Sequence, residues 1–200
     1  MSSRLSPFIL ATAAKCLGCR ACELACAAAH LPGGVSVGSL RGPLIPRLYL
    51  TRVAAVRVPV GCRHCEDAPC ATVCPNAAIL RTDRGVLVDA ARCVGCKTCM
   101  AACPVGAMEM APVCRDGRPV MRRVPDPANP ADPEATVLEP ALLASKCDLC
   151  RDREAGPACV AACPTGALAL IDPAGLKRRR NLEAALALAG AAMQPGEARS

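Results

Sequence analysis

The chain has 200 residues, with one Phe, one Tyr, no Trp and seventeen Cys, and its formal net charge is +7. Large aromatic side chains dominate the energetics of most cores, so a chain this poor in them is not expected to fold around an ordinary apolar core. The same scarcity argues against nucleic acid as a partner, because single strands bind by stacking on aromatic rings. We expect no transmembrane segment, since no apolar run reaches the roughly 18 residues that a membrane-spanning helix needs. Something other than side-chain packing must therefore hold the fold together.

Taken in chain order, sixteen of the cysteines form four motifs, which we number one to four. Motifs one and three have the spacing C-x₂-C-x₂-C-x₃-C of bacterial [4Fe–4S] ferredoxins. Motif two widens the middle gap to four residues and motif four to eight. The members are Cys16, Cys19, Cys22 and Cys26; Cys62, Cys65, Cys70 and Cys74; Cys93, Cys96, Cys99 and Cys103; and Cys147, Cys150, Cys159 and Cys163. Motifs two, three and four each end in Cys-Pro, and the proline ends the loop by fixing its φ angle.

This spacing has a chemical reason. One tight loop delivers three thiolates to one cluster, and the fourth cysteine ligates the other cluster of a pair. Four motifs therefore predict four [4Fe–4S] clusters and a protein that moves electrons. Each oxidised cluster with its thiolates carries a charge of about −2, so the loaded protein would approach about −1. The basic composition thus compensates the clusters, and we expect the chain without them to be largely unfolded.

The first half of the chain predicts short extended elements between the motifs. Residues 30–41 read as an irregular loop, and 47–60 as an extended segment that ends near a sheet edge at Pro59. Residues 78–89 predict a β-hairpin with its turn at Gly85. This hairpin leads directly into motif three, so motifs two and three are expected to form one compact unit.

The second half predicts a strand over 107–113, a turn at 116–117 and a return strand over 119–124. The proline-rich segment 125–140 reads as a loop with extended stretches rather than an element, more readily a solvated connector than a partner-facing insertion. Residues 176–193 predict a helix that opens with four basic residues. We expect its weak apolar face to pack on its own domain, with a partner or a membrane surface as the alternatives.

Pairing motif two with motif three leaves motif one to pair with motif four. The two-cluster ferredoxin rule, by which the fourth cysteine crosses over, then assigns the ligands. The expected sets are Cys16, Cys19, Cys22 and Cys163 for cluster 1; Cys147, Cys150, Cys159 and Cys26 for cluster 2; Cys62, Cys65, Cys70 and Cys103 for cluster 3; and Cys93, Cys96, Cys99 and Cys74 for cluster 4.

The expected fold class is α+β, with two pseudo-symmetric bacterial ferredoxin-like units, short helices, β-hairpins and little conventional core. The boundaries are 1–57 with 141–176 for the outer unit, 58–118 for the inner unit, 119–140 for the connecting loop and 177–200 for the basic helix and tail.

Several residues near the motifs need separate interpretations. Cys114 has no C-x₂-C partner and is interpreted as a small hydrophobe outside the ligand sets, with a redox-sensitive thiol as the alternative. His30 and His64 are expected to form structural hydrogen bonds, since cysteines fill every ligand position. Glu66 and Asp67 are interpreted as loop-fixing or capping groups. Four cations are expected to favour the reduced clusters, with surface charge compensation as the alternative: Arg20, Arg63, Lys97 and Lys146.

Other classes of protein explain the pattern less well. A disulfide scaffold needs an oxidising compartment, and residues 1–15 contain no signal peptide, so reduced thiolates point to the cytoplasm. A zinc protein needs only pairs of C-x₂-C and leaves the third and fourth cysteines unexplained. No dinucleotide loop, P-loop or Ser/His/Asp set indicates an enzyme, so we expect an electron carrier or a non-catalytic subunit of an oxidoreductase complex, with no catalytic residue. A maturation factor that supplies electrons or clusters remains an alternative.

Residues 62–79, which begin Cys-Arg-His-Cys-Glu-Asp-Ala-Pro-Cys, resemble the four-cluster iron–sulfur subunits of the dimethylsulfoxide reductase type. Residues 146–150 and 156–165 resemble them too. The compact size is nearest to the small soluble electron carriers of formate dehydrogenase, formate hydrogenlyase and carbon monoxide dehydrogenase. The resemblance implies two stacked ferredoxin-like units and supports the pairing above. It also implies a catalytic redox subunit as partner, of the molybdenum or tungsten formate dehydrogenase, NiFe hydrogenase or CO dehydrogenase class. Attachment at the periphery of a membrane complex stays open.

Overall fold

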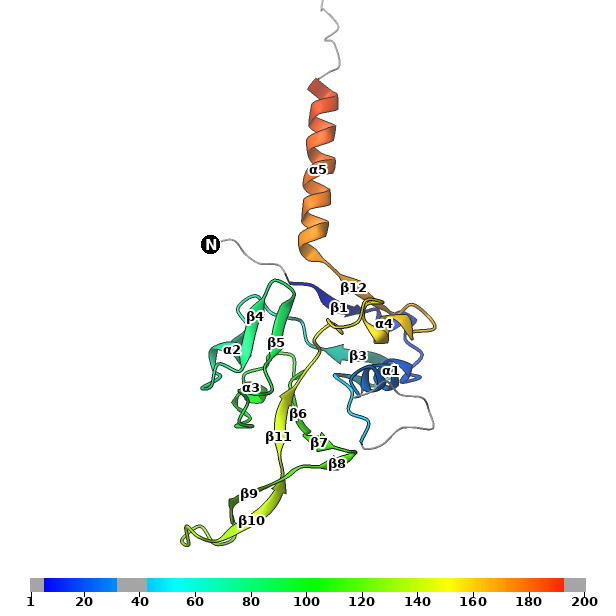
Figure 1. The fold of residues 1–200 in the computed structure, drawn as a ribbon. Helices are drawn as coiled ribbons and strands as arrows, with labels where there is room; N and C mark the ends of the chain where they lie inside the picture. The colour runs from blue at the N-terminus through cyan, green and yellow to red at the C-terminus, as the bar shows by residue number, and fades with distance from the viewer. Residues whose placement is uncertain (1–5, 32–42, 193–200) are drawn as a thin grey trace, which may run out of the picture.

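The computed structural model describes residues 6–31 and 43–192, which form a small mixed structure of short helices and two-stranded sheets (Figure 1). In chain order the elements are β1 (Phe8–Ala11), the 3₁₀ helix η1 (Ala13–Lys15), α1 (Ala21–Ala29), β2 (Leu48–Val53), β3 (Val56–Gly61), α2 (Pro69–Thr72), β4 (Ile79–Thr82), β5 (Gly85–Val88), α3 (Thr98–Ala101), β6 (Glu109–Pro112), β7 (Cys114–Arg115), β8 (Arg118–Pro119), β9 (Met121–Pro125), β10 (Thr136–Pro140), β11 (Leu142–Ser145), α4 (Ala158–Ala161), β12 (Leu168–Ile171) and α5 (Pro173–Ala192). The expected loop over 30–41 lies almost wholly outside the described residues.

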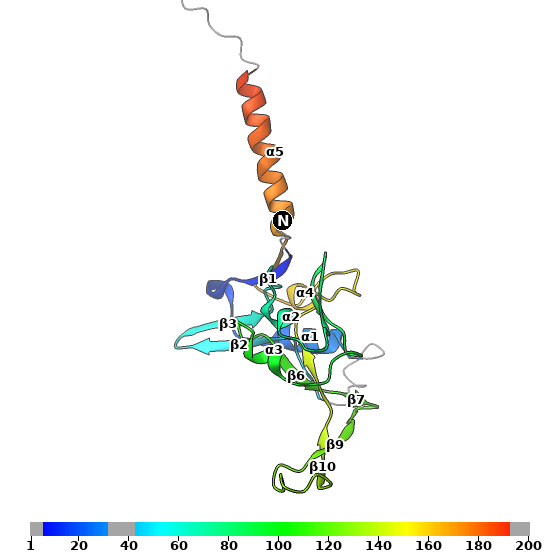
Figure 2. The same ribbon diagram turned by 90° about the vertical axis from the view of Figure 1, so that its left-hand side faces the viewer.

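Motifs one and four lie side by side although they are at opposite ends of the chain. Strand β1 pairs antiparallel with β12, with Phe8 opposite Ile171 and Ala11 opposite Leu168. Helix α1, which carries Cys22 and Cys26 of motif one, packs against α4, which carries Cys159 of motif four (Figures 1 and 2). A small buried cluster joins them and contains cysteines as well as apolar side chains: Cys22, Cys26, Leu48, Cys159 and Leu168.

Motifs two and three are neighbours in the same way. Helix α2 contacts α3, and the β4–β5 hairpin connects the two motifs as the sequence predicts. Its turn falls at Asp83 and Arg84, with Gly85 opening β5. A second buried cluster lies here and is formed by Ala68, Ile79, Val86, Cys99 and Met108. Each core is therefore built partly from cysteine and small residues, as the composition suggests.

The segment beyond motif three follows the sequence-based expectation only in part. The predicted turn at 116–117 forms between β7 and β8, with Cys114 opposite Pro119, whereas β6 pairs with β11, with Met110 opposite Ala144. Residues 121–125 instead form β9, which pairs with β10. The expectation of a loop throughout 125–140 is therefore wrong at its end. Val124 and Val137 face each other in this hairpin and are half-buried, which gives the pairing an apolar contact that proline content alone does not reveal.

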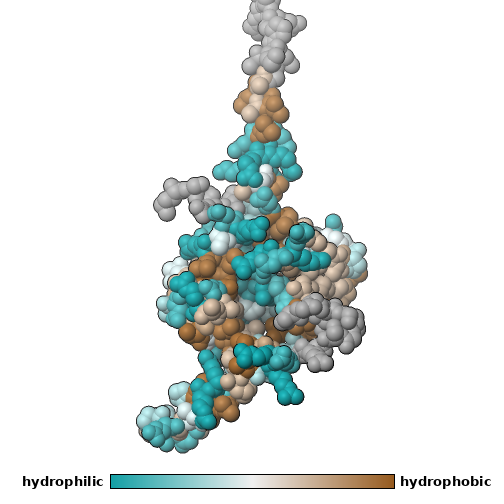
Figure 3. Space-filling model, in the orientation of Figure 1, coloured by the Kyte–Doolittle hydropathy of each residue, from teal (hydrophilic) through white to brown (hydrophobic). Residues whose placement is uncertain are grey.

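Two elements project from the body. The β9–β10 hairpin extends at one end and helix α5 at the other (Figure 1). The expectation that α5 packs on its own domain is wrong, because residues 177–189 are all exposed. Figure 3 shows a hydrophilic band near the start of α5, where Lys177–Arg180 lie, followed by an apolar stretch that includes exposed Leu182 and Leu186. Among the described residues, no helix is long and apolar enough to cross a membrane.

Candidate iron–sulfur centres

The four cysteine loops share one backbone feature. The second residue between the first two cysteines has a positive φ in every motif: 74° at Gly18, 49° at His64, 73° at Gly95 and 62° at Leu149. Glycine adopts this conformation freely, whereas a residue with a Cβ atom loses about 1–2 kcal/mol in it. The strain at His64 and Leu149 persists because the surrounding fold determines these loops. The same tight turn is thus imposed on four loops of different sequence.

The fourth cysteine of motifs two, three and four accepts a backbone hydrogen bond from the fourth residue after it. The donor is an alanine each time, in the repeat Cys-Pro-x-x-Ala. Ala78 N–H reaches Cys74 Sγ at 3.3 Å, Ala107 N–H reaches Cys103 Sγ at 3.3 Å, and Ala167 N–H reaches Cys163 Sγ at 3.2 Å. The preceding residue has a positive φ in all three. Motif one has no proline, and Cys26 Sγ instead accepts from the amide of Arg47 at 3.3 Å.

The first cysteine accepts a similar bond in three motifs. His64 N–H donates to Cys62 Sγ at 3.4 Å, and Leu149 N–H donates to Cys147 Sγ at 3.4 Å. Cys93 Sγ accepts from Ala144 in β11, also at 3.4 Å. Amide donors aimed at sulfur stabilise thiolates and, in iron–sulfur proteins, the reduced cluster. The loops therefore hold these cysteine sulfurs as hydrogen-bond acceptors for backbone amides.

Two hollows each combine three cysteines of one motif with the fourth cysteine of another. A hollow of about 330 Å³, counting space open to solvent, is lined by Cys16, Cys19, Cys22 and Cys163. A second, of about 340 Å³, is lined by Cys74, Cys93, Cys96 and Cys99. These are the residues that the sequence predicts for clusters 1 and 4.

The charges that shift the pKa values of buried thiols show which of the other cysteines lie near one another. Burial, reinforced by nearby Cys147, Cys26 and Cys150, raises the pKa of the Cys159 thiol to about 12. Burial also raises the pKa of Cys70 to about 11; Lys146 works against this rise, and Cys62 and Cys103 add to it. The first group contains the four members predicted for cluster 2, with Cys22 of cluster 1 also nearby. The second contains Cys70, Cys62 and Cys103 of cluster 3, and the same Cys62 and Cys103 act on its fourth member, Cys65.

These donor sets fit a [4Fe–4S] cluster. Thiols whose pKa is raised by burial, such as those of Cys159 and Cys70, keep their protons at neutral pH unless a cation replaces them, and bound iron does so. The candidate ligands are all sulfur, backbone amides point at several of them, and apolar residues such as Ile79 and Met110 line the second hollow. When bound, such a cluster supplies a centre that takes up and releases one electron.

Motifs four and two meet at a junction that we define by Cys147, Cys62, Lys146, His64 and Val86. Burial raises the pKa of Cys147 to about 12, and the nearby Cys62 contributes to the rise. Lys146 is 4% exposed, and its ammonium group donates to the carbonyl oxygens of Val86 and Cys147. His64 Nδ1 accepts the Val86 N–H at 3.0 Å. Burial, followed by the charge of Lys146, lowers the pKa of His64 to about 4.

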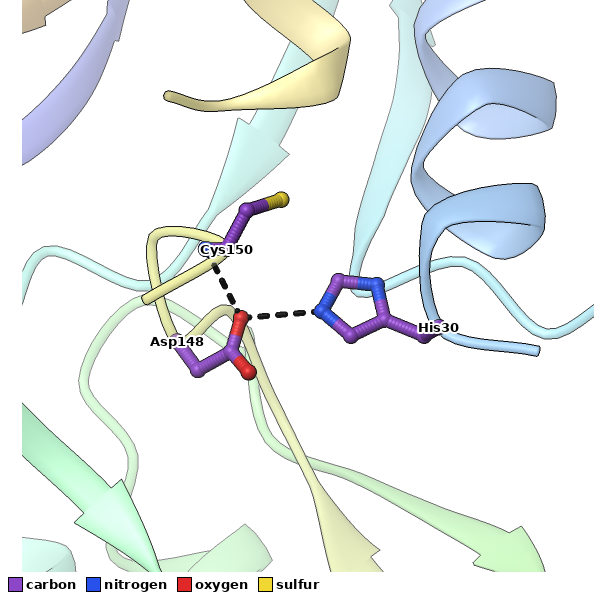
Figure 4. Close-up of side chains that lie close together, drawn as sticks. All are labelled: His30, Asp148 and Cys150. Carbon is purple, nitrogen blue, oxygen red and sulfur yellow. Dashed lines mark hydrogen bonds and ion pairs between the residues drawn. The ribbon is translucent and has the colours of Figure 1, made fainter. Parts of the chain in front are cut away.

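A second polar network ties α1 to motif four. His30 Nε2 lies 2.9 Å from Asp148 Oδ1, and Arg47 donates to Asp148 Oδ2 at 2.6 Å. Asp148 Oδ1 also accepts the Cys150 amide at 3.0 Å (Figure 4). Burial opposes the charge on His30, but hydrogen bonds to Asp148 and Cys26 outweigh it and raise the pKa of His30 to about 10. Burial likewise opposes ionisation of Asp148, yet His30 and Arg47 hold its pKa well below its usual range. The predicted hydrogen-bonding role of both histidines is confirmed.

The other loop cations lie nearer the surface. Arg20 lies 3.8 Å from Glu23 and its side chain is 68% exposed. Arg63 donates to the carbonyl oxygen of Ile9 at 3.1 Å and so links motif two to β1. Lys97 is exposed and begins α3 with a positive φ. Of the four cations that the sequence singles out, Lys146 alone is buried.

The residues expected to cap motif two do not do so. Glu66 and Asp67 are exposed, and the N-cap of α2 is Ala68, with no side-chain cap. The capping interpretation is therefore wrong. Cys114 is exposed on β7, opposite Pro119, rather than packed as a small hydrophobe.

Sequence reasoning missed two parts of the site. It did not anticipate that Asp148 organises His30, Arg47 and the Cys150 amide, because these contacts join residues far apart in the chain. It also missed the alanine amides of the Cys-Pro-x-x-Ala repeat, although that repeat is visible in the sequence.

The loops and their donor sets define a ferredoxin-type iron–sulfur protein, and comparisons with known proteins agree. A 4Fe-4S dicluster domain matches residues 53–115. In Escherichia coli (strain K12), Electron transport protein HydN is 44% identical over 84% of this chain and 89% of its own length. Putative electron transport protein YsaA is 39% identical over 88% of this chain and 96% of its length. Formate hydrogenlyase subunit 2 is 39% identical over 89% of this chain and 90% of its length.

The chain therefore belongs to this family of ferredoxin-type iron–sulfur electron-transport proteins. It binds several [4Fe–4S] clusters and transfers electrons.

Proposed function

We propose that the chain holds four [4Fe–4S] clusters in the cross-paired ligand sets predicted from the sequence. The observation that carries the proposal is that two hollows each combine three cysteines of one motif with the fourth cysteine of another. The chain then consists of two ferredoxin-like units, one from 1–57 with 141–176 and the other from 58–118. Residues 119–140 would be an appended hairpin, and 177–200 the basic helix and tail.

The four clusters would form a row. Cluster 1 and cluster 2 share motifs one and four, and cluster 3 and cluster 4 share motifs two and three. Because Cys147 and Cys62 are close, clusters 2 and 3 become neighbours in the middle of the row. Cys19 and Cys96, which belong to the sets for clusters 1 and 4, are the exposed members of the ligand sets. Electrons would thus enter near one of these loops and leave near the other.

A relay of this kind needs a partner at each end. The relatives are named for electron transport and for formate hydrogenlyase, so we propose a redox enzyme of the formate dehydrogenase, hydrogenase or CO dehydrogenase class as one partner. The chain would act as a non-catalytic carrier or subunit, because cysteines occupy all ligand positions and leave no open iron for substrate. Sixteen reduced thiolates also require a reducing compartment, for which we propose the cytoplasm.

Metal analysis of anaerobically purified protein tests the cluster count. We expect about sixteen iron and sixteen acid-labile sulfide per chain, with coupled S = 1/2 EPR signals after reduction. About four zinc without sulfide would overturn the proposal. Two donor systems then separate the partner classes: formate with formate dehydrogenase, and hydrogen with hydrogenase. The system that reduces the clusters, followed by the decrease in visible absorbance, identifies the class of partner.

A further inference from the structure

His64 carries a hydrogen-bond donor that the protein does not use. The side chain is 1% exposed, and its Nδ1 accepts the backbone N–H of Val86 at 3.0 Å. A neutral imidazole has one protonated and one unprotonated ring nitrogen, so an accepting Nδ1 places the proton on Nε2. Hydrogen bonding therefore fixes the tautomer of His64.

Within the described ranges, 6–31 and 43–192, His64 Nε2 is buried and has no hydrogen-bond partner. Leaving a buried donor unsatisfied costs about 1–3 kcal/mol, so such groups in native proteins point to an acceptor. The ring is also held in place. A Cβ atom at Gly85 would lie 2.5 Å from His64 Nδ1, which shows how closely the backbone of β5 covers the ring. The imidazole thus cannot turn to find another partner without displacing β5.

The acceptors expected at this junction are sulfurs. His64 lies between Cys62 and Cys65, and its own amide already donates to Cys62 Sγ. Cys147 is close to Cys62 on the other side of the junction. The nearby Lys146 cannot accept a hydrogen bond, and it already binds the Val86 carbonyl oxygen. The carboxylate of Asp148 is engaged by His30, Arg47 and the Cys150 amide.

We propose that the Nε2–H of His64 donates a hydrogen bond to a sulfur of the central clusters, 2 or 3, and raises the reduction potential of that cluster. The inference rests on the ligand sets of the proposed function. The reduced cluster carries one more negative charge, so a donor to its sulfur stabilises it more than the oxidised form. The cluster gains one electron, the proton stays on Nε2, and no bond to hydrogen is broken. His64 is thus a positioning residue for electron transfer through the middle of the row.

Two substitutions separate this role from a purely structural one. Asn at position 64 keeps an acceptor near the place of Nδ1, can bond Val86, and tolerates the positive φ, but it has no donor at the place of Nε2. Gln keeps a donor near the place of Nε2 and loses the acceptor for Val86. The measurements are iron and sulfide content and EPR-monitored redox titration of the whole holo-protein.

With iron and sulfide intact, His64→Asn is expected to lower the potential of one central cluster, and His64→Gln to restore most of the wild-type value. Unchanged potentials in His64→Asn, or equal shifts in both variants, would overturn the inference. A wild-type content well below sixteen iron would instead contradict the proposed function, so the two failures are distinguishable.

If both variants lose iron, isotope labelling of histidine in the wild-type protein tests the hydrogen bond directly. The chain has two histidines, so histidine labelled with ¹⁵N only in the imidazole ring introduces few signals and leaves out the His64 amide that donates to Cys62 Sγ. A ¹⁵N coupling to the spin of a reduced cluster, retained in His30→Gln, is expected for a bond from His64 Nε2–H to sulfur. Absence of any such coupling in the labelled wild-type protein would overturn the inference.

Discussion

Cys16 and Cys163 line the same hollow although they belong to the first and last cysteine motifs. The pairing of β1 with β12 brings the two ends together, and the amide of Thr12 donates to the carbonyl oxygen of Ala167 at 2.8 Å. The Ala167 amide in turn donates to Cys163 Sγ. Two hydrogen bonds to the backbone of Ala167 therefore connect the β1–β12 sheet to the sulfur of Cys163.

This relationship predicts that Cys16→Ala and Cys163→Ala damage the same cluster. Each variant should lose about four iron at most, and the double variant should lose no more than either single one. Iron and sulfide analysis, with EPR of the reduced proteins, provides the measurement.

Cys114→Ala is the control, because this cysteine lies exposed on β7 and outside the four sets. Its iron content should equal that of the wild-type protein. Additive iron losses in the double variant would show that Cys16 and Cys163 serve different clusters.

Two glycines with the same backbone requirement should respond differently to alanine. Gly95 has φ +73° and Gly106 has φ +62°, so both substitutions carry a conformational cost of about 1–2 kcal/mol. A Cβ atom at Gly95 would lie 2.4 Å from the carbonyl oxygen of Leu142 in β11, whereas one at Gly106 would meet nothing within 4 Å. On heating, we expect the Gly95→Ala protein to lose its visible cluster absorbance at a clearly lower temperature than the Gly106→Ala protein. Equal midpoints of the visible absorbance loss would contradict the packing of β11 on the motif three loop.

Lys146→Gln should lower the potentials of the central clusters, because it removes a buried positive charge that lies beside Cys147 and acts on Cys70. Lys97→Gln is the matched control in motif three. Lys97 is exposed, so solvent and salt screen its charge and the expected shift is much smaller. EPR-monitored redox titration of both variants makes the comparison. Shifts of equal size would mean that burial does not determine the effect of these cations.

Asp148→Asn should destabilise the contact between α1 and motif four. It removes the negative charge that binds His30 and Arg47, and loss of hydrogen bonds to a charged group costs about 2 kcal/mol. Asp152→Asn serves as the control, since the side chain of Asp152 is 86% exposed and its ion pair with Arg151 contributes little. Thermal loss of the cluster absorbance should come earlier for Asp148→Asn only. A similar shift in the control would point to net charge rather than to the network.

Removal of iron by a chelator under reducing conditions should unfold most of the chain. The two groups of buried core residues contain cysteine and few large side chains, so the apoprotein lacks a core that could persist without iron–sulfur clusters. Far-UV circular dichroism should lose its signal together with the visible absorbance. Residues 177–189 of helix α5 are exposed, and a chain ending at Leu176 should keep full iron content and the same bleaching rate. Native circular dichroism after complete iron loss would show that side-chain packing suffices.

Local patterns in the sequence predict the elements whose causes are local. The hairpin around Gly85 follows from alternating apolar residues and a turn signal, and β4 and β5 form there. Because cysteines fill every expected ligand position, the sequence also predicts that His30 and His64 form hydrogen bonds rather than bind metal. The pairing of β6 with β11 joins segments that are not neighbours in the sequence, so local patterns do not predict it. The exposure of α5 was missed for the same reason, since a weak apolar face does not reveal whether the body offers a surface to it.

The sequence by itself determines the chemical pattern of this protein: four cysteine motifs, whose spacing predicts that tight loops deliver three thiolates to one cluster and one to another. That information is local, because a few covalently linked residues set the reach of each loop. Only the tertiary structure decides which loops meet, because the meeting of motifs one and four depends on β1 pairing with β12 across almost the whole chain. It also decides that His64 and Lys146 are buried beside Val86, whose amide and carbonyl groups orient the two side chains.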